Sequence, residues 1–198
     1  MRIDLLRHGD TGRDGYLDGR TDPPLSQTGS QQFATQTKYR DWKLIVSSPL
    51  VRARSAAEKH SRRMATPLQI DPDWRELDFG RWDGRERREI ATEPGDAALL
   101  EAFYADPAAF TAPEGESWTS LQHRVGRALD RLTANPELSP VLVVTHGGAI
   151  RAALSLVLGW PLRSLWSLRI KPATRITLEI GRGEDGALWG ELVEIIQP

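Results

Sequence analysis

The hydrophobic positions of the chain fall into short apolar runs that alternate with longer segments of helical spacing. The runs are rich in aliphatic residues and stop at glycine, proline or polar sequence, as buried strands do; they occupy residues 2–7, 44–48, 67–70 and 141–145. Apolar residues at intervals of three to four predict helices at about 30–38, 50–63, 118–132 and 149–158. This alternation predicts an α/β fold in which a mostly parallel sheet lies between helices on both faces, a three-layer sandwich.

Two segments depart from this plan. Residues 175–180 and 188–196 alternate apolar and polar positions around a glycine-containing turn, which predicts an antiparallel hairpin at one edge of the sheet. Residues 85–117 are helical in composition but are interrupted at Glu93-Pro94-Gly95 and again by later prolines. We interpret them as a cap-like insertion in a single domain that spans residues 1–198.

Two helix starts carry capping signals. Ser26 or Thr28 is the expected N-cap of the helix near residues 30–38. Ser48 followed by Pro49 predicts an N-cap with proline at the first helical position.

Composition narrows the functional classes. The 26 Lys and Arg against 27 Asp and Glu give a net charge of −1, so no general field attracts nucleic acid or an anionic membrane. The chain has no cysteine, which excludes thiolate nucleophiles and cysteine-based zinc sites and fits a cytoplasmic protein. No signal-peptide core and no membrane-spanning apolar stretch are evident. The sequence leaves the oligomeric state open, and a homodimer is compatible with it.

Two of the predicted strands end in a histidine followed by glycine. Arg7-His8-Gly9 closes the first strand, and Thr145-His146-Gly147-Gly148 closes the run at 141–145. Ligands of open α/β sheets bind at the carboxyl ends of the strands, so we expect the two histidines to meet there.

Three further residues complete a candidate site. Arg52 lies in the first turns of a helix, where it adds its charge to the positive end of the helix dipole. With Arg7 it would supply two planar forks for phosphate oxygens. Glu76 lies among aromatic residues and is a candidate general acid, although pairing with Arg75 is the simpler alternative. One neutral imidazole as nucleophile and a second, protonated imidazole would suffice for two-step phosphomonoester hydrolysis.

Other chemistries have weaker support. His60 and His123 lie within predicted helices, and no His, Asp or Glu residues have the spacing of metal ligands. We therefore expect no metal and no cofactor. Loops typical of nucleotide binding and of serine hydrolases are absent as well.

Four motifs, in order along the chain, resemble those of the histidine phosphatase superfamily, in its phosphoglycerate mutase-like branch. They are Leu6-Arg7-His8-Gly9, Ser48-Pro49-Leu50-Val51-Arg52, Glu76-Leu77-Asp78-Phe79-Gly80 and Thr145-His146-Gly147. The resemblance implies His8 as nucleophile, Glu76 as proton donor, and a phosphate site formed by Arg7, His8, Arg52, Glu76, His146 and Gly147.

Asp14 is the main departure, because many family members have Asn there. A carboxylate at this position would repel phosphate unless it is turned away or pairs with a cation such as Arg13 or Arg20. Asp10 replaces the usual Glu, a milder change.

Within the family, the chain is similar to α-ribazole phosphatases of cobalamin biosynthesis, mainly through Tyr16–Gly19, Phe79–Trp82, Glu114–Ser117 and Leu165–Ile170. This implies a metal-independent phosphatase of a small-molecule phosphate ester such as α-ribazole 5′-phosphate. A broad-specificity phosphatase and a phosphoglycerate mutase are the alternatives; the short end after the last strand disfavours the mutase, which must shield its phosphoenzyme from water. A non-catalytic phospho-ligand binding or signalling module is a third hypothesis, disfavoured by the intact candidate set.

Overall fold

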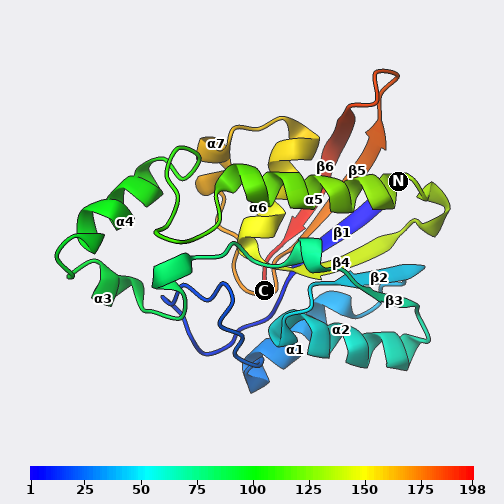
Figure 1. The fold of residues 1–198 in the computed structure, drawn as a ribbon. Coiled ribbons are helices and arrows are strands. Elements are labelled where there is room, and N and C mark those ends of the chain that lie inside the picture. Colours follow the sequence, from blue (N-terminus) through cyan, green and yellow to red (C-terminus); the bar gives the residue numbers. More distant parts are fainter.

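The computed structural model describes residues 1–198 and contains one six-stranded sheet with helices on both faces (Figure 1). The strands are β1 (Arg2–Arg7), β2 (Leu44–Ser47), β3 (Leu68–Ile70), β4 (Val141–Thr145), β5 (Arg175–Arg182) and β6 (Leu188–Ile196). The helices are α1 (Gln27–Thr37), α2 (Val51–Met64), α3 (Arg87–Ile90), α4 (Asp96–Ala105), α5 (Trp118–Thr133), α6 (Gly147–Leu158) and α7 (Leu162–Trp166). Single 3₁₀ turns occur at Pro72–Trp74, Gly80–Trp82 and Pro136–Leu138.

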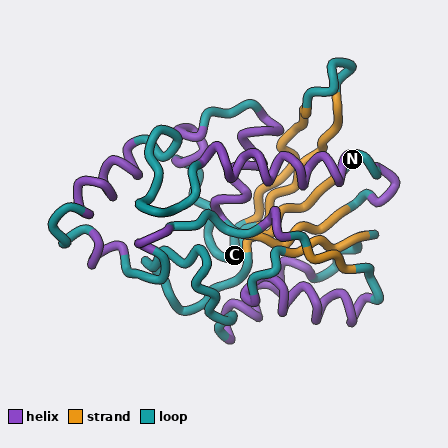
Figure 2. The backbone as a smooth tube through the Cα atoms, in the orientation of Figure 1, coloured by secondary structure: helices purple, strands orange, loops and turns teal.

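The strand order is β3-β2-β4-β1-β5-β6. The pairs β3–β2, β2–β4 and β4–β1 are parallel, whereas β1–β5 and β5–β6 are antiparallel. The predicted mostly parallel sheet with an antiparallel hairpin at one edge is therefore confirmed. Figure 2 shows the strands side by side and the longer loops on the side of the sheet away from the N-terminus.

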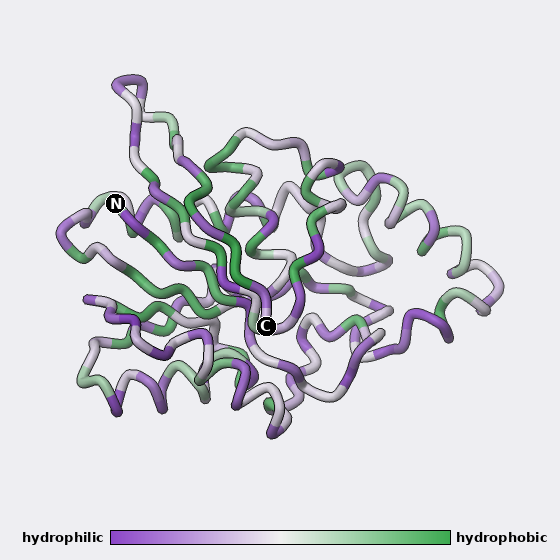
Figure 3. The backbone as a smooth tube through the Cα atoms, turned by 180° about the vertical axis from the view of Figure 1, so that it is seen from behind, coloured by the Kyte–Doolittle hydropathy of each residue, from purple (hydrophilic) through white to green (hydrophobic).

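The central strands are buried on both faces because helices cover each side. Along β4, Val141 and Val143 belong to the larger core cluster, which α5 and α6 contribute to, while Leu142 and Val144 belong to a smaller cluster with α1 and α2. Such strands show continuous apolar sequence rather than alternation. Figure 3 shows this hydrophobic centre and a largely hydrophilic segment around α3.

The helix starts agree with the sequence in one case and differ in another. Ser26 is the N-cap of α1, and its hydroxyl accepts a hydrogen bond from the Gly29 N–H. The predicted cap of α2 is wrong: the helix begins at Val51, and the carboxylate of Asp22 accepts from the Val51 N–H at 2.6 Å. This cap comes from a loop distant in sequence, which local capping rules do not reveal.

The segment between residues 85 and 117 contains α3 and α4, with the expected break between them, and extends beyond the end of the sheet (Figure 1). Phe103 of α4 packs edge-on against Phe79 and Trp82 of the preceding loop. Helix α4 thus covers these two aromatic side chains.

Candidate active site

The parallel strands β2, β4 and β1 are neighbours, so their carboxyl ends deliver three site segments to one edge of the sheet. His8 follows β1, His146 follows β4, and Ser48 follows β2 just before α2. The rings of His8 and His146 lie 5.1 Å apart between centroids, inclined at 60°. The expectation that the two histidines meet at this edge is confirmed.

The orientation of His8 is set by its own backbone. Its Nδ1 lies 2.8 Å from the carbonyl oxygen of Gly9, which can only accept, so Nδ1 carries the proton. In the neutral ring Nε2 then keeps its lone pair. Burial, with the charges of Arg7 and Arg52, lowers the pKa of His8 well below its ordinary value. These features favour a neutral His8 imidazole at neutral pH, with the lone pair of Nε2 free.

His146 is completely buried, and its Nε2 lies 2.8 Å from the Ser48 hydroxyl. That hydroxyl accepts from the Leu50 N–H, and its own hydrogen can be donated to Nε2; in that arrangement the proton of the ring is on Nδ1. Nδ1 has no hydrogen-bond partner within the protein. Burial and Arg52 lower the pKa of His146 well below its ordinary value, which favours the neutral ring in the protein alone; the protonated ring is expected with phosphate bound. The neutral ring can still donate from Nδ1.

The two arginines have different environments. Arg7 donates from Nη1 to the Ile170 carbonyl at 2.7 Å, while its buried Nε has no partner. Arg52 is 1 % exposed, and its terminal nitrogens donate to the carbonyls of Asp18, Gly19 and Thr21 and to the Asp22 carboxylate. Only its Nε is unpartnered. Arg52 thus holds the 18–22 loop and offers one N–H, not the free fork that the sequence suggested.

Glu76 lies at the N-terminus of α6. Its Oε1 accepts from the N–H groups of Leu77 and Gly148, both at 2.9 Å, and Oε2 lies 3.2 Å from the Gly148 nitrogen. A side chain at Gly148 would collide with Oε1 at 2.3 Å, so glycine is needed for this approach. The alternative partner, Arg75, instead donates to the Pro72 carbonyl.

Gly147 lies between the Glu76 carboxylate and the Arg7 guanidinium. A Cβ placed on Gly147 would lie 3.8 Å from Arg7 Nε and 3.9 Å from Glu76 Oε2. All six residues proposed from the sequence therefore converge on one edge of the sheet: Arg7, His8, Arg52, Glu76, His146 and Gly147.

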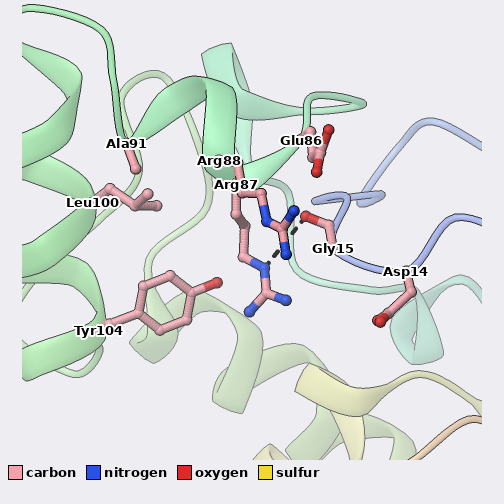
Figure 4. A pocket seen from close by; sticks show the side chains of 8 residues that line it. All are labelled: Asp14, Gly15, Glu86, Arg87, Arg88, Ala91, Leu100 and Tyr104. Carbon is pink, nitrogen blue, oxygen red and sulfur yellow. Dashed lines mark hydrogen bonds between the residues drawn. The ribbon is translucent and has the colours of Figure 1, made fainter.

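A cleft of about 730 Å³ opens from this edge and is lined by Arg7, His8, Glu76 and Gly147 among others. A second hollow of about 560 Å³ adjoins it and shares Asp14, Gly15, Arg87 and Tyr104 (Figure 4). Asp14 is exposed and pairs with neither expected arginine, because Arg13 binds Asp18 at 2.9 Å and Arg20 binds Asp78 at 3.2 Å.

Three side chains that were not proposed from the sequence contact the site: Arg151 lines the cleft, Ser48 contacts His146, and Arg124 binds the Glu76 carbonyl. Arg151 donates to the carbonyls of Leu165 and Leu168; its position one helical turn after Gly147 was the available signal. Ser48, expected from the sequence as a helix cap, is the hydrogen-bond partner of His146. Arg124 gave no signal, because only the tertiary structure brings α5 to the Glu76 loop.

Two other features bear on function. The structure contains no group of three or more His, Cys, Asp or Glu side chains arranged to hold a metal ion. None of the helices combines the length and hydropathy required to traverse a bilayer.

Comparison with known proteins gives a consistent result. The model of the histidine phosphatase superfamily (branch 1) matches residues 3–189. Adenosylcobalamin/α-ribazole phosphatase of Salmonella typhi is 29% identical over 188 residues, 92% of each chain. A Proteus mirabilis protein named probable phosphoglycerate mutase is 34% identical over 177 residues, 86% of this chain and 81% of that protein. The structure of a mycobacterial glucosyl-3-phosphoglycerate phosphatase matches with a TM-score of 0.85 and 28% identity, covering 97% of this chain and 96% of that one.

Proposed function

Because the chain belongs to the histidine phosphatase superfamily, we propose that it is a metal-independent phosphomonoester hydrolase that works through a phosphohistidine on His8. The observation that carries the proposal is the state of His8: a buried, neutral imidazole whose proton is held on Nδ1 by the Gly9 carbonyl. Its Nε2 is thereby available to attack phosphorus.

The phosphoryl group would be held by donors that the protein leaves unpartnered. Buried N–H groups without partners are rare, since each costs about 1–3 kcal/mol. Here Arg7 Nε, Arg52 Nε and His146 Nδ1 are all unpartnered next to the nucleophile. Phosphate oxygens, and more so the charge that builds up on them during transfer, would satisfy these donors.

Glu76 would act twice. As a carboxylic acid it would give its proton to the departing ester oxygen as His8 Nε2 forms its bond to phosphorus. As a carboxylate it would then take a proton from the water that attacks the phosphohistidine, which releases phosphate and restores His8. Its hydrogen bonds to the Gly148 and Leu77 N–H groups would keep it in place for both steps.

For the substrate we propose a nucleotide-like phosphate ester such as α-ribazole 5′-phosphate, supported by the relative in Salmonella typhi that bears that name. Phosphoglycerate mutase activity is the second candidate, favoured by the relative in Proteus mirabilis. We also propose that residues 85–117 form a cap over the cleft. We further propose that the protein is located in the cytoplasm, binds no nucleic acid and forms a homodimer. Light scattering would test the homodimer.

A panel of ribazole, nucleotide and sugar phosphates, assayed for phosphate release with EDTA present, tests the function. We expect release that depends on His8 and persists with EDTA. Isomerisation of 3-phosphoglycerate that outpaces phosphate release would favour the mutase, and a His8→Ala variant that hydrolyses at the wild-type rate would contradict the proposal.

A further inference from the structure

The loop that carries Glu76 is held by side chains rather than by a sheet or a helix. The carbonyl oxygens of four successive residues, 73–76, all accept hydrogen bonds from side chains. Thr145, the residue before His146, donates to the Trp74 carbonyl at 2.7 Å. The other three carbonyls are bound by one residue, Arg124 of α5.

Every N–H of the Arg124 guanidinium has an acceptor. Nη1 donates to the carbonyls of Asp73 at 2.8 Å and Arg75 at 2.6 Å, and Nη2 donates to that of Glu76 at 2.9 Å. The carboxylate of Glu116 accepts the remaining two, from Nε at 2.7 Å and from Nη2 at 2.8 Å. A guanidinium has five N–H donors, so none is left for a substrate.

The loop is also held from its other end. The Glu116 N–H donates to the Asp78 carbonyl at 2.9 Å, and the Asp78 N–H donates to the Glu116 carboxylate at 3.4 Å. Arg124 is 7 % exposed, and hydrogen bonds of this buried, charged kind resist displacement. The position of the Glu76 backbone therefore depends on this buried pair.

We propose that Arg124, held by Glu116, is a positioning residue for catalysis, which keeps Glu76 at the distance that proton transfer to the leaving group requires. The inference rests on the function proposed above. It predicts a defect in the proton transfers of Glu76 and not in phosphate binding, because the phosphate-binding donors of Arg7, Arg52 and His146 make no hydrogen bond to Arg124.

The test compares Arg124→Lys and Arg124→Gln with wild type on an alkyl phosphate, whose leaving group needs a proton, and on 4-nitrophenyl phosphate, whose leaving group does not. We expect kcat/KM on the alkyl ester, which reports the first step only, to fall by about 10²-fold, since a displacement near 1 Å costs about that much. We expect kcat/KM on the aryl ester to change by less than about threefold and inhibition by orthophosphate to stay the same.

Arg127→Gln is the matched control. Arg127 lies on the same helix and pairs with the Asp73 carboxylate at 2.8 Å, but it is largely exposed and touches none of the loop carbonyls. We expect wild-type kinetics from it. Glu116→Gln gives a milder second variant, expected to show the same leaving-group dependence with a loss of roughly tenfold.

Equal losses on both esters, or a leaving-group effect in Arg127→Gln as strong as in the Arg124 variants, would overturn the positioning role. If the Arg124 variants fail to fold, the Glu116→Gln result decides in the same way. A wild-type protein that releases phosphate from neither ester would instead refute the proposed function.

Discussion

Gly148 determines where the Glu76 carboxylate lies, and Gly148→Ala should displace it. The added Cβ would lie 2.3 Å from Glu76 Oε1 and 3.5 Å from Leu77 Cβ. Because the carboxylate is the movable partner, it has to give up its 2.9 Å contact with the Gly148 nitrogen. A charge-assisted hydrogen bond of this kind contributes about 1.5–3 kcal/mol.

The expected cost falls on the steps that need the acid. General acid–base catalysis contributes about 10²–10⁴-fold, and a misplacement of about 1 Å removes roughly 10²-fold. We therefore expect kcat/KM on an alkyl phosphate, which reports the first step only, to fall by about 10²-fold in Gly148→Ala. The kcat/KM for 4-nitrophenyl phosphate should fall by less than about threefold, and orthophosphate should inhibit as it does in wild type.

Gly126→Ala is the matched control, because Gly126 is also a helical glycine and its Cβ would meet only Leu156 at 3.7 Å. It should raise stability by about 0.5–1 kcal/mol, as Ala usually does within helices, and leave both activities unchanged. Full activity of Gly148→Ala on alkyl phosphates would refute the placement of Glu76 as the acid, and an equal loss on both esters would indicate general damage to the site.

Three further predictions concern charge. Asp14→Asn should lower KM for phosphomonoesters by roughly fivefold with kcat unchanged, because it removes about 1 kcal/mol of repulsion between the carboxylate and the phosphate. Steady-state kinetics test this, and a higher KM would instead indicate that Asp14 binds substrate hydroxyls. Burial lowers the pKa of His8, His60 and His146, so the unfolded chain binds more protons than the folded one. The free energy of unfolding should therefore rise with pH up to about 6.5. Urea titrations in which the free energy of unfolding does not fall on acidification below that pH would contradict this. Arg175→Ala should lower the free energy of unfolding by about 3–5 kcal/mol, because it leaves the buried Asp4 carboxylate without its cation. The control Arg40→Ala, which breaks a partly exposed pair with Glu194, should lower it by less than about 1 kcal/mol. Thermal denaturation measures both.

The strands and most helices follow from the sequence because their cause is local. A run such as residues 141–145 is apolar throughout since helices cover both faces of β4, and α5 shows its buried stripe at helical spacing. The meeting of His8 and His146 follows from one further rule, that parallel strands bring their carboxyl ends to the same edge.

The remaining features depend on contacts between distant segments. The Asp22 cap of α2, the Arg52 bonds to the 18–22 loop, and the Arg124 clamp on the Glu76 loop each join residues at least 29 positions apart. No periodicity or capping rule encodes such pairs. The partner of Asp14 was left open by the sequence: Arg13 and Arg20, the two candidates, bind Asp18 and Asp78 in the fold.

The central claim is that His8 carries the phosphoryl group between the two steps, and direct trapping tests it best. The Glu76→Gln variant should accumulate the intermediate, because the carboxylate that activates water is gone. Mixing it with a radiolabelled aryl phosphate, quenching in alkali and mapping the peptides by mass spectrometry should give acid-labile label on His8 alone. Label on another residue, or rapid phosphate release with no labelled protein at any time, would contradict the account.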